Sequence, residues 1–542
     1  MTRIVNNVLM DRTGWILRIL AVILVAGASM VREQVRVDGG LVEGAPGSDR
    51  SIQVFKGIPF AAPPVGDLRW QAPHPVASWS GVKKATEFGP RCMQGPIFSD
   101  MIFRDKGPSE DCLYLNVWTP AKTPKQKLPV MVWIYGGGFQ AGSASEPRQD
   151  GENLAKKGVI VVSLNYRLGV FGFMAHPELT KESPHHASGD YGLLDQAAAL
   201  EWVKRNIAAF GGDPGKVTIF GESAGSFSVS ALVASPLAKG LFQRAIGESG
   251  AFFSLNGGPL GQRRLADAER GGSDFATAMG ANSIAELRAK PAGEVLQAAM
   301  KAGGFRFSPN IDGYFFPTDV TTIYAQGKQN HVDLLAGWNH DEVRAAATLA
   351  KPRPTAQTFP DQLRRQFKDD ATLALKFYPA TSDDIALESA ANLASDVFIA
   401  YSTWKWIELE YRTGGSSVYR YSFDKAPPIP PGTVRNGQPI TTKDIGARHA
   451  GEIEYVFGAL KSAPDVPWEP GDWKVSEAMM SYWSNFAKTG DPNGPGLVKW
   501  PRYNEATGFQ VLHLNVNIEA TPDSDRGRFQ FLDGTKDKST AH

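Results

Sequence analysis

A serine between two glycines could supply a nucleophile. Residues 221–225 (GESAG) follow an apolar run at 217–220 and precede a helix-compatible segment at 226–233. In that strand–turn–helix context, G-x-S-x-G is typical of a nucleophile elbow, which exposes a serine hydroxyl at a helix N-terminus. The sequence therefore predicts Ser223 as a nucleophile. A similar segment further on does not fit, because Ala251 stands where the second glycine belongs.

Three consecutive glycines could hold negative charge as it develops on a substrate oxygen. Residues 136–138 end the apolar run 128–135 (LPVMVWIY). Because glycine has no side chain, its backbone N–H can turn toward a substrate without obstruction. The N–H of Ala224, directly after the serine, would be a further donor. A phosphate-binding P-loop is excluded, since no Lys-Ser or Lys-Thr follows the glycines.

A nucleophilic serine needs a histidine base and an acid, in the chain order serine, acid, histidine. Five histidines follow the serine: His331, His340, His449, His513 and His542. His449 lies in a loop before a buried-looking segment, which suits a base, whereas His513 sits in an apolar run and His542 ends the chain. Asp341 and Glu342 both follow a strand-like run, and spacing alone does not choose between them.

The sequence patterns around these residues are typical of the strands and helices of an α/β sheet. Residues 128–135, 159–164 and 217–220 are near-continuous apolar runs, as expected for strands buried on both faces of a mostly parallel sheet. A helical pattern over 193–210 lies between the last two runs. A second helix is expected at 475–488, followed by Gly490 and Pro492 as stop signals.

Composition is that of an ordinary globular protein. The chain has 542 residues, 42% hydrophobic and 21% charged, with a net charge of +1. That charge gives no electrostatic reason to expect nucleic acid as a partner. A Pro-rich stretch at 426–432 resembles a linker, but no shift in composition marks a domain boundary. We expect residues 29–542 to form a single catalytic domain.

The N-terminus has the features of a signal peptide. Arg3, Arg12 and Arg18 precede or flank the apolar run 19–25, and a small-residue cleavage pattern follows at 26–28. The run is shorter than the roughly 20 residues that span a bilayer. Cleavage after residue 28 would leave no stable membrane anchor and an exported chain, periplasmic or secreted. A retained amphipathic anchor is the alternative.

Cys92 and Cys112 are the two cysteines of the chain. In an exported protein such a pair is more often bridged than free, with two buried thiols as the alternative. Two cysteines cannot supply a four-ligand zinc site, and no histidine pair at helical spacing assists them. We therefore expect no metal and no cofactor.

Taken together, the motifs resemble the type-B carboxylesterase family, which also contains the cholinesterases. The resemblance covers nearly the whole mature chain and rests on segments 55–70 (FKGIPFAAPPVGDLRW), 110–120 (EDCLYLNVWTP), 135–139 (YGGGF), 210–225 (FGGDPGKVTIFGESAG) and 485–493 (NFAKTGDPN). It implies the α/β-hydrolase fold, a large mostly parallel sheet flanked by helices, with insertions that form a gorge over the active site.

The resemblance also assigns roles to individual residues. Ser223 matches the nucleophile, Glu342 the acid and His449 the base. The matching oxyanion donors are Gly137, Gly138 and Ala224. Family members usually have glycine after the acid, where this chain has Val343.

Further positions match supporting residues of the family. Glu222, Ser249 and Glu452 match a buried network beside the triad. The two cysteines match a disulfide that closes a loop over the gorge mouth. Residues 93–111 contain no Trp, the residue with which cholinesterases hold a quaternary ammonium, so choline esters are not expected as substrates.

The function implied is hydrolysis of small-molecule carboxylic esters through an acyl-enzyme. The alternatives are an amidase, or an esterase specialised for a bulky or carboxylate-bearing substrate. A non-catalytic cholinesterase-like binding protein is disfavoured, because all three triad positions are occupied. If they face the entrance, four cations near the site would favour anionic esters: Arg104, Lys106, Lys443 and Arg448. The sequence does not predict an oligomeric state.

Overall fold

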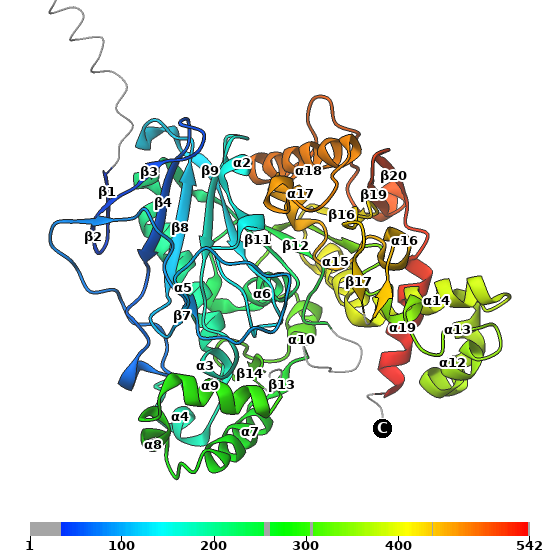
Figure 1. The fold of residues 1–542 in the computed structure, drawn as a ribbon, viewed down its shortest axis with the longest axis horizontal. Helices are drawn as coiled ribbons and strands as arrows, with labels where there is room; N and C mark the ends of the chain where they lie inside the picture. The colour runs from blue at the N-terminus through cyan, green and yellow to red at the C-terminus, as the bar shows by residue number, and fades with distance from the viewer. Residues whose placement is uncertain (1–33, 254–260, 304–306, 436, 540–542) are drawn as a thin grey trace, which may run out of the picture.

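A twisted central sheet with helices around it dominates the computed structural model (Figure 1). The structure describes residues 34–253, 261–303, 307–435 and 437–539. The predicted signal peptide, residues 1–28, lies outside the described residues.

The large sheet has eleven strands in the order β20-β19-β16-β15-β12-β11-β9-β10-β8-β4-β3. From β10 through β19 every neighbouring pair is parallel, and the pairs at the two edges are antiparallel. The strands are β3 (Ala45–Pro46), β4 (Gln53–Pro59), β8 (Tyr114–Thr119), β9 (Leu128–Ile134), β10 (Ile160–Leu164), β11 (Gly212–Glu222), β12 (Arg244–Glu248), β15 (Asp333–Asn339), β16 (Val418–Phe423), β19 (Gln510–Leu514) and β20 (Glu519–Pro522). The prediction of a large, mostly parallel sheet is confirmed.

Helices cover both faces of the sheet. The larger ones are α5 (Tyr191–Asn206), α6 (Ala224–Ala234), α15 (Tyr401–Thr413), α18 (Pro470–Thr489) and α19 (Arg526–Ser539). Successive residues of a strand point to opposite faces. At the end of β12, a Cβ added to Gly247 would lie 2.3 Å from the Trp406 ring of α15, whereas the carboxylate of Glu248 accepts a hydrogen bond from Trp483 of α18. Hence α15 and α18 pack on opposite faces.

The predicted helix at 193–210 is α5 followed by one 3₁₀ turn. The predicted helix at 475–488 begins earlier than expected, at Pro470. Its start is fixed by a capping box in which Glu469 and Asp472 satisfy each other's backbone N–H groups. It ends as predicted, with Gly490 in the left-handed conformation at φ 80°.

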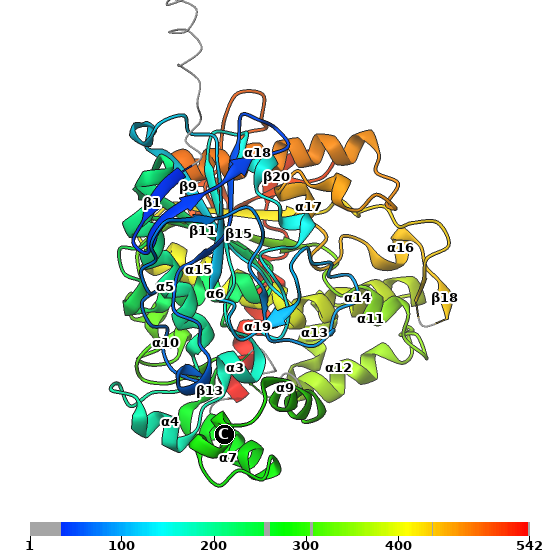
Figure 2. The same cartoon turned by 60° about the vertical axis from the view of Figure 1, so that its left-hand side comes forward.

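Smaller elements extend outward beyond the sheet (Figures 1 and 2). The remaining α-helices are α2 (Glu152–Ala155), α3 (Gly169–Phe173), α4 (Pro177–Glu182), α7 (Leu265–Ala278), α8 (Ile284–Arg288), α9 (Ala292–Lys301), α10 (Val320–Ala325), α11 (Ala345–Thr348), α12 (Phe359–Phe367), α13 (Ala371–Phe377), α14 (Asp383–Ser395), α16 (Thr442–Ile445) and α17 (Ile453–Val456). The minor strands are β1 (Gln34–Val37), β2 (Gly40–Glu43), β5 (Val82–Lys84), β6 (Arg91–Cys92), β7 (Pro108–Ser109), β13 (Arg263–Arg264), β14 (Asn310–Ile311), β17 (Val434–Arg435) and β18 (Gln438–Pro439).

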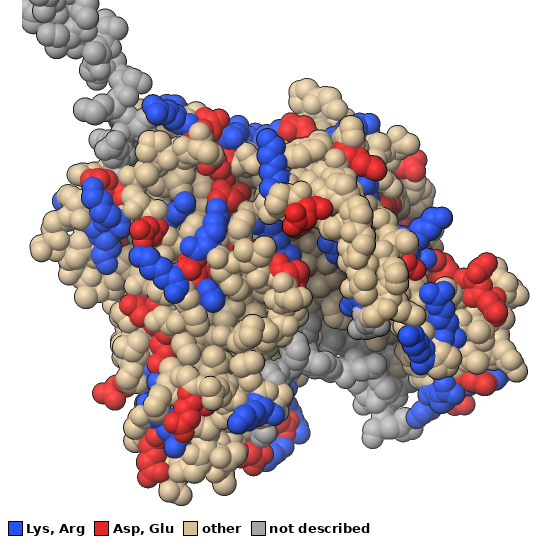
Figure 3. All heavy atoms as spheres, viewed as in Figure 1, with Lys and Arg blue, Asp and Glu red and all other residues tan. Residues whose placement is uncertain are grey.

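Cys92 and Cys112 form a disulfide, and both residues are buried. Within the described ranges, no helix combines the length and the apolar character needed to cross a membrane. On the face shown in Figure 3, acidic and basic side chains are interspersed, with no large area of one sign.

Candidate active site

Ser223 occupies the sharp turn between β11 and α6. Its backbone lies at φ 54° and ψ −124°, a conformation that costs energy for a residue with a side chain. A Cβ added to Gly225 would lie 1.9 Å from the carbonyl oxygen of Ile134, and one added to Gly221 would lie 2.6 Å from the carbonyl carbon of Gly225. Both flanking positions therefore require glycine, which is why the turn has the sequence GESAG.

Ser223, His449 and Glu342 form a continuous hydrogen-bonded chain. His449 Nε2 lies 2.9 Å from Ser223 Oγ, and His449 Nδ1 lies 2.6 Å from Glu342 Oε2. A carboxylate can only accept, so Nδ1 of the neutral imidazole carries the proton and Nε2 is free to accept one from the serine. This arrangement can deprotonate Ser223 as its oxygen attacks an electrophile.

Spacing alone does not show whether Asp341 or Glu342 contacts the histidine, and the structure of the loop after β15 answers this question. Glu342 accepts the N–H of Asn339 through Oε1 at 2.9 Å, and its backbone carbonyl accepts the N–H of His449 at 3.0 Å. Asp341 instead contacts Arg344 at 3.2 Å and accepts the N–H of Ala447 at 3.0 Å. The structure thus brings Glu342, and not Asp341, to the imidazole.

The loop of three glycines after β9 reaches the nucleophile at Gly136. A Cβ added to Gly136 would lie 2.5 Å from the Glu222 carbonyl oxygen and 3.0 Å from Ser223 Cβ. Gly137 and Gly138 have φ of 102° and 62°. Among described residues, no protein acceptor takes the N–H groups of Gly137, Gly138 or Ala224, the first residue of α6. These donors are available to an oxygen placed beside Ser223.

Three further buried glutamates form a cluster near the triad residues. Glu222 Oε1 lies 3.3 Å from His449 Nε2, and Glu452 accepts a hydrogen bond from Asn339 at 2.5 Å. Glu248 is held by Trp483 at 2.8 Å. Burial raises the pKa of Glu222 and of Glu452, and it raises the pKa of Glu248 to about 8.

Ser249 lies beside this cluster in a strained conformation, with φ 57°. Its hydroxyl is buried without a protein partner among the described residues, as are one oxygen of Glu452 and one of Glu248. Buried polar atoms of this kind are normally satisfied by ordered water. Of the residues predicted as a supporting network, Glu222 and Glu452 act electrostatically on His449, and the role of Ser249 stays a prediction.

The charge around His449 sets its proton affinity. Burial lowers the pKa of its imidazole, but the negative charges of Glu222 and Glu342 and the hydrogen bond to Glu342 raise it by more. The net effect is a pKa above the ordinary value near 6.5. An imidazolium at this position would therefore be stabilised by two adjacent acids.

A cavity of about 910 Å³ opens beside the imidazole. Its lining includes His449 and Glu342, Ser99 and Asp100 from the disulfide-bridged loop, and the Pro-rich segment 428–430. The stretch that resembles a linker in the sequence thus forms a wall of the site. The bridged loop also reaches the glycines, since a Cβ added to Gly137 would lie 3.1 Å from the methyl carbon of Met101.

Of the four cations considered from the sequence, Arg448 lines the cavity, whereas Arg104, Lys106 and Lys443 do not. Arg104 pairs with Asp150 at 2.7 Å, Lys106 pairs with Glu87, and neither lines the cavity. Nearby acids hold these two cations away from the cavity. Two further arginines, Arg344 and Arg435, line the cavity together with Arg448.

Sequence reasoning missed two residues in contact with the triad loops. Asn339 donates its backbone N–H to Glu342, and its side-chain amide to the Arg448 carbonyl at 2.7 Å. The sequence feature that could have identified Asn339 is its position at the end of a strand-like run, three residues before the acid. The Phe398 ring stands edge-on to His449, 5.1 Å between centroids, from a π-helical turn that no pattern indicated.

Across the described ranges, no group of three or more His, Cys, Asp or Glu side chains is arranged to hold a metal ion.

Comparison with known proteins gives a consistent picture. The Carboxylesterase family profile matches residues 31–531. A fumonisin B1 esterase of Sphingopyxis macrogoltabida is 38% identical over 488 residues, covering 86% of this chain and 83% of the relative. A medium-chain fatty acyl-CoA hydrolase precursor of Anas platyrhynchos is 38% identical over 503 residues, covering 86% and 85%.

Solved structures agree with the sequence relatives. A PNB esterase superposes with a TM-score of 0.77 at 35% identity, covering 92% of this chain and 99% of its own. A carboxylesterase of Geobacillus stearothermophilus gives a TM-score of 0.78 at 32% identity, covering 92% and 100%. The chain therefore belongs to the type-B carboxylesterase family and is a serine carboxylic-ester hydrolase with the α/β-hydrolase fold.

Proposed function

We propose that Ser223, His449 and Glu342 are the catalytic triad of this esterase. His449 Nε2 takes the Ser223 proton as Oγ attacks the ester carbonyl carbon. The N–H groups of Gly137, Gly138 and Ala224 hold the oxyanion that forms. Glu342 orients the imidazole and stabilises its charged form. The alcohol leaves with the proton from His449, which gives an acyl-enzyme.

Water completes the cycle. His449 removes a proton from a water molecule, the resulting hydroxide attacks the acyl carbon, and the proton returns to Ser223 as the acid leaves. The proposed mechanism requires no cofactor. The observation that carries it is the pair of hydrogen bonds at His449, 2.9 Å to Ser223 Oγ and 2.6 Å to Glu342 Oε2.

Substitution of the nucleophile and base tests this assignment. Ser223→Ala and His449→Gln should each lower kcat for a simple activated ester by about 10⁴-fold or more, and the double variant by little more, because the residues act as a unit. Circular dichroism and thermal unfolding should show intact folds. Asp341→Asn is the matched control, since Asp341 adjoins the acid but does not reach His449. A variant at Ser223 that retains substantial turnover would refute the triad.

We further propose that residues 1–28 are a signal peptide and that the mature enzyme is exported to the periplasm or beyond the cell. The charged and apolar pattern of this segment supports the proposal, as does the Cys92–Cys112 disulfide, because disulfides persist in oxidising compartments.

For substrate, we propose bulky esters whose acid or alcohol part carries a carboxylate. The cavity volume of about 910 Å³ accommodates a large molecule. Arg448 is exposed there next to His449, and among the described residues no acid forms an ion pair with it. Its guanidinium is therefore free to form a bidentate pair with a substrate carboxylate.

The substrate proposal is tested with matched neutral and anionic esters. Arg448→Gln should lower kcat/KM for the anionic ester by up to about fivefold, since an exposed ion pair contributes roughly 0–1 kcal/mol. It should leave the neutral ester unchanged, and the effect should fade in high salt. Arg36→Gln, an exposed arginine on β1, is the control. Equal loss for both esters would refute the proposal.

A further inference from the structure

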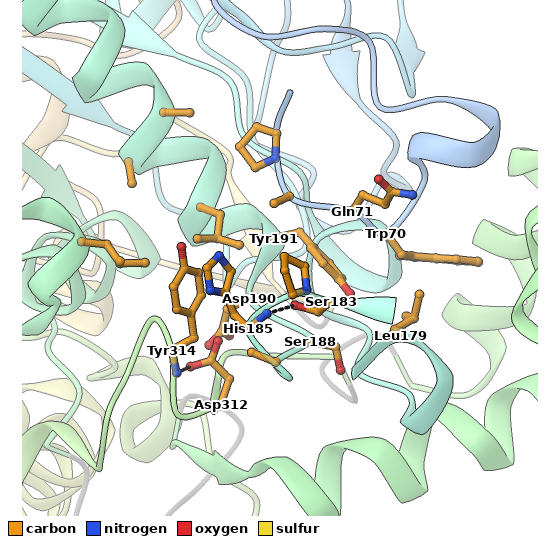
Figure 4. Close-up of a pocket in the computed structure, with 18 of the residues that line it drawn as sticks. Trp70, Gln71, Leu179, Ser183, His185, Ser188, Asp190, Tyr191, Asp312 and Tyr314 are labelled. Carbon is orange, nitrogen blue, oxygen red and sulfur yellow. Dashed lines mark hydrogen bonds between the residues drawn. The ribbon is translucent and has the colours of Figure 1, made fainter. Parts of the chain in front are cut away.

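A second cavity of about 520 Å³ lies outside the active site. It is bounded by the segment 70–74, by α4 and the loop after it, by α5, and by the turn that holds Asp312 and Tyr314 (Figure 4). It shares no lining residue with the cavity at His449. Its volume falls within the range of roughly 300–1,000 Å³ typical of small-molecule sites.

The walls of this cavity combine apolar surface with charge of one sign. Most of the lining is apolar or aromatic: Trp70, Pro73, Leu179, Tyr191, Leu194 and Tyr314 are representative. The imidazole of His185 stacks on the Tyr314 ring, with centroids 3.7 Å apart and planes within 7°. The formally charged lining residues are acids, Glu182, Asp190, Glu201 and Asp312, with no lysine or arginine among the lining.

Two of these acids already have cationic partners. Glu182 pairs with Arg288 at 2.8 Å, and Glu201 lies 3.5 Å from Arg205. The other two are buried and lie next to each other, below the stacked rings (Figure 4). The charge available to a ligand in this cavity is therefore that of Asp190 and Asp312.

Asp190 has an unsatisfied oxygen. Its side chain is 1% exposed, and its Oδ1 accepts the backbone N–H of Asn310 at 3.0 Å. Its Oδ2 has no hydrogen-bond partner among the described residues. Asp312 uses one oxygen, Oδ1, to accept the N–H groups of Tyr314 and Phe316, both at 3.0 Å.

The unpartnered oxygen carries a cost that a ligand could remove. Burial, and then the charge of Asp312, raise the pKa of Asp190, and burial raises the pKa of Asp312. A cation bound beside the pair would oppose both of these shifts. A buried polar atom without a partner costs free energy, and a positively charged donor is the partner that offsets it most.

We propose that this cavity is a binding site for a small protonated amine with an aromatic or alkyl body. The ammonium group donates hydrogen bonds to Asp190 Oδ2 and to Asp312 Oδ2. The apolar body packs against the side chains of α5 and the Tyr314 ring, which can also attract the cation through its face. An anionic ligand of the same shape is repelled by the two acids, and a neutral one lacks the charge that pairs with them.

Calorimetric titration with three probes of one shape tests the proposal. The probes are 3-phenylpropylammonium, 3-phenylpropan-1-ol and 3-phenylpropionate, titrated into the intact protein at neutral pH. The amine should bind at one site at least tenfold more tightly than the alcohol, and the carboxylate should not bind there. Equal affinity for amine and alcohol, or no amine binding at millimolar concentration, would overturn the proposal.

Substitutions of residues that line the cavity test whether the amine binds there. Asp190→Asn keeps the shape but presents an amide in place of the carboxylate, so amine affinity should fall at least tenfold while ester hydrolysis is unchanged. Glu410→Gln is the matched control, because Glu410 is also a buried acid, with a pKa raised by burial to about 8, but lies outside both cavities. Ala198→Trp, which fills the cavity from α5, should abolish amine binding if Asp190→Asn fails to fold. Amine binding that survives Ala198→Trp, or that Asp190→Asn leaves unchanged, would refute the site.

Discussion

At the scale of single residues, the imidazole of His449 is placed between two carboxylates. Glu342 binds its Nδ1, and Glu222 lies 3.3 Å from its Nε2, the same nitrogen that faces Ser223. A negative charge beside Nε2 favours the imidazolium, which lowers the energy of the transition state. It also raises the pKa of the free base, so a larger fraction is protonated and inactive near neutral pH.

Substitution of Glu222 should separate its effect on the transition state from its effect on the pKa of His449. Only neutral His449 can accept the serine proton, so kcat/KM should rise with pH through the pKa of His449. That pKa is raised above 6.5, so we expect the midpoint to lie above 6.5. In Glu222→Gln one of the charges that raises the pKa is gone, so the midpoint should move to lower pH, while kcat at high pH should fall.

The control for this experiment is Glu248→Gln, which removes a buried acid that does not contact the imidazole. It should move the midpoint less than Glu222→Gln does. A midpoint that stays in place in Glu222→Gln, with chemistry shown to be limiting, would contradict the electrostatic role given to Glu222.

Residue types and spacing predicted part of this site. The glycines around Ser223 were informative, because a side chain at either position would collide with the neighbouring strand or helix. The choice between Asp341 and Glu342 could not be made from spacing, since adjacent residues in a loop can face either way. It depends on hydrogen bonds to Asn339 and Ala447, and the latter lies more than a hundred positions along the chain.

At the scale of elements, parallel strands bring the site together. The ends of β9, β11 and β15 lie at one edge of the sheet, and each is followed by a loop that supplies part of the site. Sequence patterns predicted these strands because their apolar runs are long and their ends carry glycine or acid. They did not predict the π-helical turn that carries Phe398, nor that the Pro-rich segment 428–430 lines the cavity, because both depend on tertiary packing.

The disulfide-bridged loop is the element most dependent on a covalent constraint. The bridge closes 20 positions of chain and holds Met101 against the glycines that face Ser223. Protein from the exported fraction should show no free thiol when titrated under denaturing, non-reducing conditions. Loss of the bridge in Cys92→Ser with Cys112→Ser should lower stability by about 3 kcal/mol on the chain-entropy model. Two titrating thiols in the native protein would contradict both the bridge and the exported location.

At the scale of the whole molecule, the catalytic cavity and the second cavity use different surfaces. The first draws on the bridged segment, on the loop after β15 and on residues between 428 and 449, and the second on α4, α5 and the turn at Asp312. No sequence pattern indicated the second, because Asp190 and Asp312 are widely separated in the chain and each alone resembles an ordinary loop residue. Family resemblance predicted the overall fold, whereas this pairing emerges only when the chain is folded.

The account rests on Ser223 as the nucleophile, and covalent labelling tests that most directly. The enzyme is treated with an organophosphate until ester hydrolysis stops, digested, and mapped by mass spectrometry. We expect one adduct per chain, on the peptide that contains Ser223, formed in proportion to the activity lost, and none in Ser223→Ala. Loss of activity with the adduct on any other residue, or full modification of Ser223 without loss of activity, would contradict the assignment.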